Sequence, residues 1–351
     1  MAEKILKNVC LNGTLTDIVT ENGKILSVGK TDRKGIDCGG YDIYPGLFDI
    51  HIHGAVGVDT MDYDLKTLAR YEKAHGTTSF LATTTTMPYE ELKRVCENIP
   101  SRDDDCAKIE GIHLEGPCIS EKAIGAQNPD FIQYPDVEKF ESLPNVKMIT
   151  IAPEIDGALD FIKKSSAVIS IGHTRSDYDT AIEAIKCGAK CLSHTFNAMP
   201  SLHHREPSVI GAAFDANIYA QLISDGVHVH PSAVRILFKL FGSERVVLIS
   251  DSTKGAGLGD DVYEFGGQKM IIKDGIARTE SGALCGSTTP LWDCVKKAIE
   301  FGIPKEDAFR SASYTPACLL GYKKGKIEAG FDAEFVLADK DLNIIDTFIF
   351  D

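Results

Sequence analysis

The chain has 351 residues, of which 43% are hydrophobic and 25% are charged, so disorder, collagen and coiled coil are poor interpretations. This length fits two domains or one large barrel with an appendage. Lys and Arg number 37 and Asp and Glu 51, and the net charge of -14 argues against a protein that grips nucleic acid or anionic lipid with its whole surface.

Neither a signal peptide nor a membrane span is expected. The N-terminus lacks an uninterrupted apolar segment, and nowhere do ~20 apolar residues follow one another without a charge. The ten cysteines include no Cys-x-x-Cys pair, so we expect reduced thiols in a cytoplasmic protein.

Short β-type runs open the chain. Apolar runs at 4–11, 15–19 and 25–28 are separated by Asn-Gly pairs at 12–13 and 22–23. Asn-Gly between apolar runs is typical of tight hairpins, so this part predicts a small antiparallel sheet.

From residue 44 onward, apolar β-rich runs alternate with longer amphipathic segments. Eight strands, each followed by a helix over ~250 residues, are typical of a parallel (β/α)8 barrel of the TIM type, an α/β fold. The predicted strands are 47–52, 79–84, 109–114, 147–152, 167–171, 190–194, 219–224 and 245–249. The amphipathic segments between the strands are predicted to be helices, and examples are 64–75, 90–99, 176–187, 231–241 and 289–301.

The end of the chain returns to short strands, predicted at 326–328, 334–339 and 344–350. The simplest topology joins both ends of the chain, 1–45 and 324–351, in one small β-sandwich domain beside a barrel of residues 46–323. Residues 260–281 have the pattern of a hairpin insertion after the eighth strand, and the sequence does not decide whether it joins the small domain.

Side chains that can bind metals follow several of the predicted barrel strands. His51 and His53 are two residues apart on the first strand, so both project to the same side. Other such side chains end the third, fifth, sixth and eighth strands, namely Glu115, His173, His194 and Asp251. Because barrel active sites are built at the carboxyl ends of the strands, we expect these side chains to converge on one metal site.

The strings PGLFDIHIHG, HLEGP, IGHT, HTFNAM and HREP resemble the amidohydrolase superfamily and, within it, deacetylases of N-acetylated amino-sugar phosphates. The resemblance covers nearly the whole chain. It implies that Glu115, His173 and His194 hold a principal metal, and that His51 and His53 complete a second site with Glu115 bridging. One or two divalent ions per subunit are therefore expected; the ligands suit zinc, iron or manganese, with zinc as the default.

The resemblance also implies a reaction. A bound divalent ion can lower the pKa of its water to ~7 and polarise an amide carbonyl. Asp251 would be the catalytic carboxylate that accepts a proton and passes it to the departing amine; a pure metal ligand or a strand-end cap is the alternative. The expected activity is hydrolysis of N-acetyl-D-glucosamine 6-phosphate to D-glucosamine 6-phosphate and acetate, in amino-sugar catabolism.

A further set of residues is implied to bind the substrate. Backbone N–H groups of Asn197 and Ala198 lie where a phosphate could dock, and His228 matches a histidine that contacts the sugar phosphate. Arg205 would clamp the phosphate, with reach across the interface of a homodimer as one option and a surface ion pair with Glu206 as the alternative. Gln127 stands where many relatives have histidine, which could alter sugar selectivity.

Three remaining residues have weaker assignments. His113 shares a strand face with Glu115 and could support a metal ligand, whereas Asp49 is expected to be a buried hydrogen-bonding residue. Lys254 is either an exposed lysine or a contact to the phosphate.

Two other functions stay open: a deacetylase for the galactosamine epimer, and a non-catalytic protein that binds a sugar phosphate.

Overall fold

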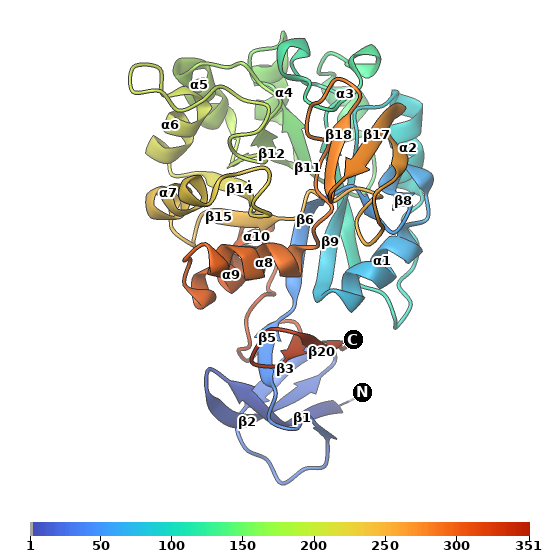
Figure 1. Cartoon of the computed structure of the whole chain (residues 1–351), viewed down its shortest axis with the longest axis vertical. Coiled ribbons are helices and arrows are strands. Elements are labelled where there is room, and N and C mark those ends of the chain that lie inside the picture. The colour runs from blue at the N-terminus through green and yellow to red at the C-terminus, as the bar shows by residue number, and fades with distance from the viewer. Residues whose placement is uncertain (1–2) are drawn as a thin grey trace.

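The computed structural model describes residues 3–351; residues 1–2, the start of the predicted small domain, lie outside the described residues. Eight parallel strands form one sheet in the order β15-β14-β13-β12-β11-β10-β9-β6 (Figure 1). They are β6 (Leu47–Ile52), β9 (Thr77–Thr84), β10 (Lys108–Glu115), β11 (Val146–Ile151), β12 (Val168–Ile171), β13 (Cys191–Leu192), β14 (Tyr219–Ile223) and β15 (Val246–Ile249). The predicted (β/α)8 barrel is confirmed.

Hydrogen bonds between the two edge strands' carboxyl ends close the sheet into a barrel. The Asp251 N–H donates to the His51 carbonyl at 2.9 Å, and the His53 N–H donates to the Ser252 carbonyl at 2.9 Å. The same segments carry predicted metal ligands, so closure of the barrel also brings those ligands together.

Helices surround the barrel because each buries one apolar face against the strands. In α1, Leu65, Leu68 and Ala69 are buried, at the spacing of one helix face, and Asp64 caps its N-terminus by accepting from the Thr67 N–H. The helices are α1 (Leu65–Ala74), α2 (Tyr89–Glu97), α3 (Val137–Glu141), α4 (Ala158–Lys164), α5 (Tyr178–Cys187), α6 (Ser208–Asp215), α7 (Pro231–Phe241), α8 (Leu291–Glu300), α9 (Lys305–Ala312) and α10 (Tyr314–Leu320). Short 3-10 turns are η1 (Thr60–Asp62), η2 (Glu121–Ala123) and η3 (Pro129–Phe131).

A separate apolar cluster fills the barrel interior below the rim. Strand residues such as Phe48, Leu81 and Val247 pack there with Ala317 and Leu319 of α10, which covers the floor of the barrel. This packed floor leaves the carboxyl-end rim as the end at which polar side chains gather.

Both ends of the chain meet in a seven-stranded sheet at the far end of the molecule from the barrel mouth (Figure 1). The strand order is β20-β19-β5-β1-β2-β3, and β4 pairs with β1. Its strands are β1 (Glu3–Leu11), β2 (Thr14–Glu21), β3 (Lys24–Val28), β4 (Ile36–Asp37), β5 (Asp42–Pro45), β19 (Glu334–Ala338) and β20 (Ile344–Ile349). The predicted division at 45/46 and 323/324 stays a prediction.

The predicted Asn-Gly turns are confirmed, since Asn12 and Asn22 take φ values of 49° and 50° before their glycines. The short strand predicted at 326–328 is wrong. The edge of β3 bonds instead to a later segment, with the Ile25 N–H donating to the Phe331 carbonyl at 2.8 Å and the Gly330 N–H donating to the Ile25 carbonyl at 2.7 Å. The strand-like pattern arises because Ile327 packs on the core of the small sheet.

The predicted insertion is a three-stranded antiparallel sheet, β16 (Val262–Phe265), β17 (Gln268–Lys273) and β18 (Ile276–Thr279), which we call the flap. It does not join the small sheet; Figure 1 shows β17 and β18 in orange beside the barrel mouth, opposite the small sheet. A short hairpin, β7 (Gly54–Ala55) and β8 (Val58–Asp59), follows the first barrel strand. Among the described residues, no helix is both long and apolar enough to cross a membrane.

A buried ionic cluster ties the small sheet to the barrel. Lys324, 2% exposed, bonds Ser79 of β9 at 2.7 Å and Glu334 of β19 at 3.2 Å, and also contacts Glu110 of β10. Glu334, 5% exposed, also pairs with Lys108 at 3.1 Å. Because charges buried this deeply need partners, loss of one member should be costly.

We predict that Lys324→Met lowers the free energy of unfolding by about 3–5 kcal/mol, because it leaves buried carboxylates with less compensation. Urea unfolding monitored by circular dichroism measures the change. Lys297→Met is the control: Lys297 pairs with Glu300 at 3.0 Å on the surface, where the loss should stay below ~1 kcal/mol. Equal losses in the two variants would contradict the prediction.

The same cluster predicts a pH window. Burial alone would raise the pKa of Glu334, but Lys324 and Lys108 hold it below its usual 4.5, so its contribution is present above pH 4.5 and is lost as pH falls through the lowered pKa. Burial alone would lower the pKa of Lys324, but Glu334 and Glu110 raise it above 10.5, so its contribution is lost as pH rises through that raised pKa. The stability advantage of wild type over Lys324→Met should therefore be largest between these limits and shrink outside them, as urea unfolding over a range of pH measures.

Candidate metal centre and active site

Six predicted side chains gather at the carboxyl ends of the barrel strands. His51 lies on β6, His53 follows that strand, and Glu115 is the last residue of β10. The other three lie two residues beyond β12, β13 and β15, namely His173, His194 and Asp251. All six side chains are at most 7% exposed, so the barrel rule brings them to one buried place.

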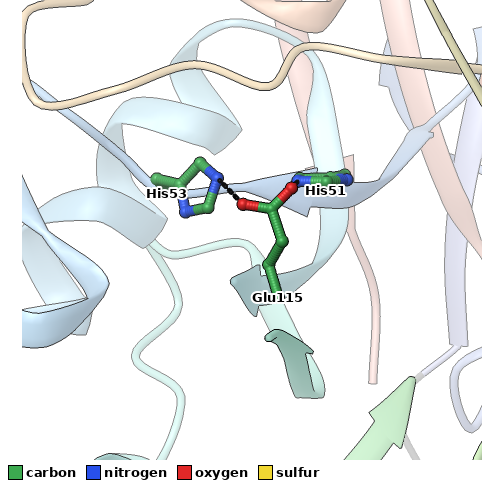
Figure 2. A group of neighbouring side chains, drawn as sticks. All are labelled: His51, His53 and Glu115. Atoms are coloured by element: carbon green, nitrogen blue, oxygen red, sulfur yellow. Dashed lines mark ion pairs between the residues drawn. The ribbon is translucent and has the colours of Figure 1, made fainter. Parts of the chain in front are cut away.

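Glu115 is the centre of this group. Its Oε1 lies 3.1 Å from Nε2 of His51, 3.2 Å from Nε2 of His173 and 2.9 Å from Nε2 of His194. Its Oε2 lies 3.2 Å from Nε2 of His53. Figure 2 shows the carboxylate between the rings of His51 and His53. One carboxylate therefore faces four imidazoles.

The four histidines present their Nε2 atoms inward because their Nδ1 atoms are already engaged. Backbone carbonyls face Nδ1 of three of them, at 3.0 to 3.2 Å, and a side-chain oxygen faces the fourth at 2.9 Å. The pairs are His53 with Thr83, His173 with Ala123, His194 with Asn197, and His51 with Gln221. Because an oxygen of this kind only accepts, each Nδ1 keeps its proton, so Nε2 is the nitrogen whose lone pair becomes available to a metal ion when the ring loses its second proton.

This arrangement fits a divalent cation. Lone pairs on Nε2 face carboxylate oxygens, and Nε2 of His173 lies only 3.1 Å from Nε2 of His194, so uncompensated groups would repel one another. Nε2 of His51 is buried without a hydrogen-bond partner. Two overlapping sets of possible ligands result, one of His51, His53 and Glu115 and the other of Glu115, His173 and His194.

A third group of possible metal ligands lies near the surface and is already paired with cationic side chains. Asp103, Asp105 and Cys106 lie close enough together to bind an ion, but Asp103 pairs with Lys66 at 3.0 Å and Asp105 with Arg70 at 2.7 Å. Surface cations already neutralise these carboxylates.

Asp251 lies beside both members of the His-x-His pair. Its Oδ1 is 3.3 Å from Nε2 of His53 and 3.5 Å from Nε2 of His51. Burial alone would raise the pKa values of Asp251 and Glu115, but the neighbouring histidines lower both below their usual ranges, with His51 the strongest influence on each. Both carboxyl groups are therefore ionised at neutral pH.

The backbone is bent sharply at three of the six positions. His173, His194 and Asp251 have φ values of 46°, 28° and 48°, in the left-handed region that non-glycine residues avoid. Each costs on the order of 1–3 kcal/mol. The bends come directly after short strands and turn the side chains toward the common centre.

A pocket of about 240 Å³ opens over these ligands. Gln127, Asn197, Ala198 and His228 line it, as the substrate-binding prediction requires, although their contacts to a substrate stay predictions. Phe265 of the flap also lines it and sets its ring edge against His53, with ring centroids 5.2 Å apart.

One of the two backbone N–H groups expected to bind phosphate is already engaged in a hydrogen bond. The Asn197 N–H already donates to the His194 carbonyl at 2.9 Å, whereas the Ala198 N–H donates to no atom within the described part of the chain. His228 donates from Nδ1 to Asp225 at 2.7 Å. Burial alone would lower the pKa of His228, but Asp225 raises it, which favours a cation facing the pocket.

Arg205 is not part of this pocket. It lies on the exposed loop 201–206 and borders a separate groove with Arg175 and Pro207. Its guanidinium contacts His204 at 2.7 Å, and no ion pair with Glu206 occurs among the described residues. A role of Arg205 in the site of its own subunit therefore has no support from its position.

His113 and Asp49 are both buried beneath the metal ligands and hydrogen-bonded. His113 bonds the Ile50 carbonyl at 3.0 Å and Thr150 at 2.8 Å, and its ring packs against that of His51, 4.6 Å away. Burial holds the pKa of His113 well below its usual value, so it is a neutral support beneath His51. Asp49 is fully buried and accepts from the N–H groups of His51 and Ser250, as predicted.

The prediction of an exposed Lys254 is wrong, because its side chain is buried between two acidic neighbours. Its Nζ lies 3.1 Å from Asp62 in η1 and 3.6 Å from Glu264 in the flap, and it does not line the pocket. Sequence reasoning missed these partners because Asp62 lies far from Lys254 in the chain, and Glu264 is brought back to it by the fold of the flap.

Two residues that shape the site, Gln221 and Phe265, were also missed by sequence reasoning. Gln221 holds His51 in place, and its signal was available as a polar residue inside the apolar run of the seventh barrel strand. Phe265 gave no such signal, since an insertion of short strands does not reveal which side chain will face the pocket.

Comparisons with known proteins agree with this geometry. The Amidohydrolase family matches residues 43–351. The chain is 36% identical to N-acetylglucosamine-6-phosphate deacetylase of Vibrio furnissii, over 94% of this chain and 88% of the relative. It is 37% identical to the enzyme of that name from Bacillus subtilis, over 86% of this chain and 82% of the relative.

A solved structure agrees over nearly the whole length. N-acetyl-D-glucosamine-6-phosphate deacetylase of Mycobacterium smegmatis, a mutant in complex with N-acetyl-D-glucosamine-6-phosphate, has a TM-score of 0.90 to this chain. It is 30% identical, and the match covers 99% of this chain and 98% of that one.

Proposed function

Because this chain belongs to the amidohydrolase family, we propose that it hydrolyses N-acetyl-D-glucosamine 6-phosphate to D-glucosamine 6-phosphate and acetate. The observation that carries the proposal is the convergence of four histidines around Glu115, with Asp251 beside His51 and His53, at the carboxyl ends of the barrel strands. Near full-length similarity to deacetylases of this substrate supports the choice of substrate. The reaction belongs to amino-sugar catabolism.

A divalent metal suits both the family and the buried ligands. We propose that His173 and His194 would hold one zinc ion and that His51 and His53 would hold a second, with Glu115 available as a ligand to both. A divalent ion here supplies Lewis acidity that polarises the amide carbonyl and lowers the pKa of water to ~7.

Asp251 is the group proposed to move the proton. Its carboxylate lines the pocket beside His51 and His53, and positive charge at that place holds its pKa below the usual value, so it is ionised at neutral pH. It can therefore accept the proton of the attacking water on a carboxylate oxygen and deliver it to the amine nitrogen as the amide bond breaks. The imidazoles beside it hold the carboxylate in place.

The substrate's phosphate is proposed to meet His228 and the Ala198 N–H in the pocket. His228 supplies positive charge, since Asp225 raises its pKa, and Ala198 supplies a free backbone donor. Asn197 then contributes by holding His194, through its carbonyl at 3.2 Å from Nδ1.

We further propose a homodimer in which the partner's Arg205 completes the phosphate site. Arg205 does not line the pocket of its own chain, yet the resemblance assigns it to phosphate. The loop that carries it exposes Leu202, 47% exposed, and the adjoining α6 exposes Phe214, 39% exposed, and such apolar surface suits an interface. A cytoplasmic location is also proposed, because it suits ten cysteines of which none is paired.

Acetate release by the purified, metal-analysed protein tests the function. We expect rapid release from N-acetylglucosamine 6-phosphate and much slower release from N-acetylglucosamine, which lacks the phosphate. The 6-phosphate of N-acetylgalactosamine is the third substrate, and a preference for it would move the assignment to the epimer. No release from any of the three by metal-loaded protein would contradict a deacetylase.

Asp251→Asn should retain the metal and lose turnover. The amide cannot accept a proton, so kcat should fall by roughly 10²–10⁴-fold, the usual contribution of general acid–base catalysis. Metal content is measured on the same samples by mass spectrometry. Unchanged kcat at full metal content would remove Asp251 from proton transfer.

Arg205→Met should raise KM for the phosphorylated substrate by about 10- to 100-fold, because a charged hydrogen bond is lost. Arg235→Met is the control, since within residues 3–351 Arg235 bonds only Ser232 and the Phe301 carbonyl, away from the pocket. Mixing Arg205→Met subunits with Asp251→Asn subunits should restore activity, as one mixed site then has both groups. A dimer without such recovery, or a fully active monomer in sedimentation, would contradict the cross-subunit role.

A further inference from the structure

The loop after β10 brings a buried amide against the central carboxylate. Gln127 is 3% exposed, and its Nε2 donates to Oε2 of Glu115 at 2.5 Å. Its Oε1 accepts from the backbone N–H of Thr86 at 2.7 Å, just beyond β9. One side chain therefore connects the ends of two barrel strands at the metal centre.

The orientation of this amide is determined by its partners. A backbone N–H only donates, so the amide oxygen must face Thr86, and an ionised carboxylate only accepts, so the amide NH2 must face Glu115. Gln127 thus offers Glu115 a donor, which cannot itself bind a metal ion.

The two oxygens of Glu115 have different surroundings. Oε1 faces three imidazoles within 3.2 Å, so several groups restrain it. Among the described residues, Oε2 faces His53, at 3.2 Å, and Gln127 and no other polar side chain. Since a carboxylate oxygen has two lone pairs, Oε2 can accept from Gln127 and still serve the site of His51 and His53.

We propose that Gln127 is a positioning residue that holds Oε2 of Glu115 toward His53, with Oε1 left facing His51, and thereby sets the affinity for the second of two metal ions. Without it, the carboxylate is free to rotate about its terminal bond and to leave the second site with two imidazoles. The first site keeps His173 and His194, whose Nδ1 atoms are bonded independently of Gln127.

The loop is itself held, so that Gln127 is preorganised. The Ala126 carbonyl accepts from Gln268 of the flap at 3.0 Å, and the Ala123 carbonyl accepts from His173 at 3.0 Å. Gly125 has a φ of 59°, and a Cβ there would lie 3.2 Å from the His173 ring. The loop therefore fits closely between the flap and a metal ligand.

This inference rests on the proposed metal centre and not on the proposed substrate. The test is calorimetric titration of metal-free protein with Zn²⁺, which needs no turnover. Gln127→Met keeps the length of the side chain and removes both hydrogen bonds. Gln133→Met is the control, because Gln133 also makes one backbone and one side-chain hydrogen bond, outside the metal site. Its amide NH2 donates to the Met87 carbonyl at 3.0 Å, and its amide oxygen accepts from Lys139 at 2.9 Å.

We expect wild type and Gln133→Met to bind two ions. Gln127→Met should bind the first ion as they do and the second roughly 10- to 100-fold more weakly, the usual effect of losing a partner of a metal ligand. The melting temperature of the metal-free protein reports folding separately, and Gln127→Met should match Gln133→Met in it.

The remaining outcomes count against the inference or its premise. Equal affinity of both sites in Gln127→Met and Gln133→Met would overturn it, as would equal weakening of both sites together with a lower melting temperature. A wild type that binds only one ion also overturns it, since no second site would exist to position. A wild type that binds no divalent ion contradicts the proposed metal centre itself.

Discussion

The site depends on one buried carboxylate. Glu115 is 2% exposed and faces four imidazole nitrogens at 2.9 to 3.2 Å. Such a charge is tolerated in the interior only if cations or donors surround it. The histidines meet this need when a metal lies between them and the carboxylate, because their Nδ1 atoms are already bonded and their Nε2 lone pairs point inward.

The barrel accounts for how these groups meet. The strands are short, and the backbone leaves them through left-handed residues at His173, His194 and Asp251. Local strain of this kind persists when surrounding structure enforces it, and at Asp251 a hydrogen bond that closes the barrel does so, since the Asp251 N–H donates to the His51 carbonyl. At the opposite end, α10 and the Lys324 cluster seal the barrel and join it to the small sheet. The packed end of the barrel thus lies opposite the end whose backbone is strained at the site residues.

Much of this architecture could be predicted from the sequence because the signals are local. The eight apolar runs predict the barrel strands, and the barrel rule then places His51, Glu115 and His173 on one rim even though they are far apart in the chain. Side-chain roles that depend on distant partners could not be predicted. Asp62 lies far from Lys254 in the chain, so no local pattern predicts their ion pair. The loop that carries Gln127 has no regular pattern that would place its amide against Glu115. The error at 326–328 has the same origin, because the partner of β3 was decided by residues 330–331.

The central claim is that Glu115 is shared by two metal ions, and anomalous X-ray diffraction at the zinc edge from crystals of zinc-loaded protein tests it most directly. The account predicts two peaks, one between Glu115 and the pair His173 and His194 and the other between Glu115 and the pair His51 and His53. Peaks that avoid Glu115, for example only at the surface group of Asp103 and Asp105, would contradict it.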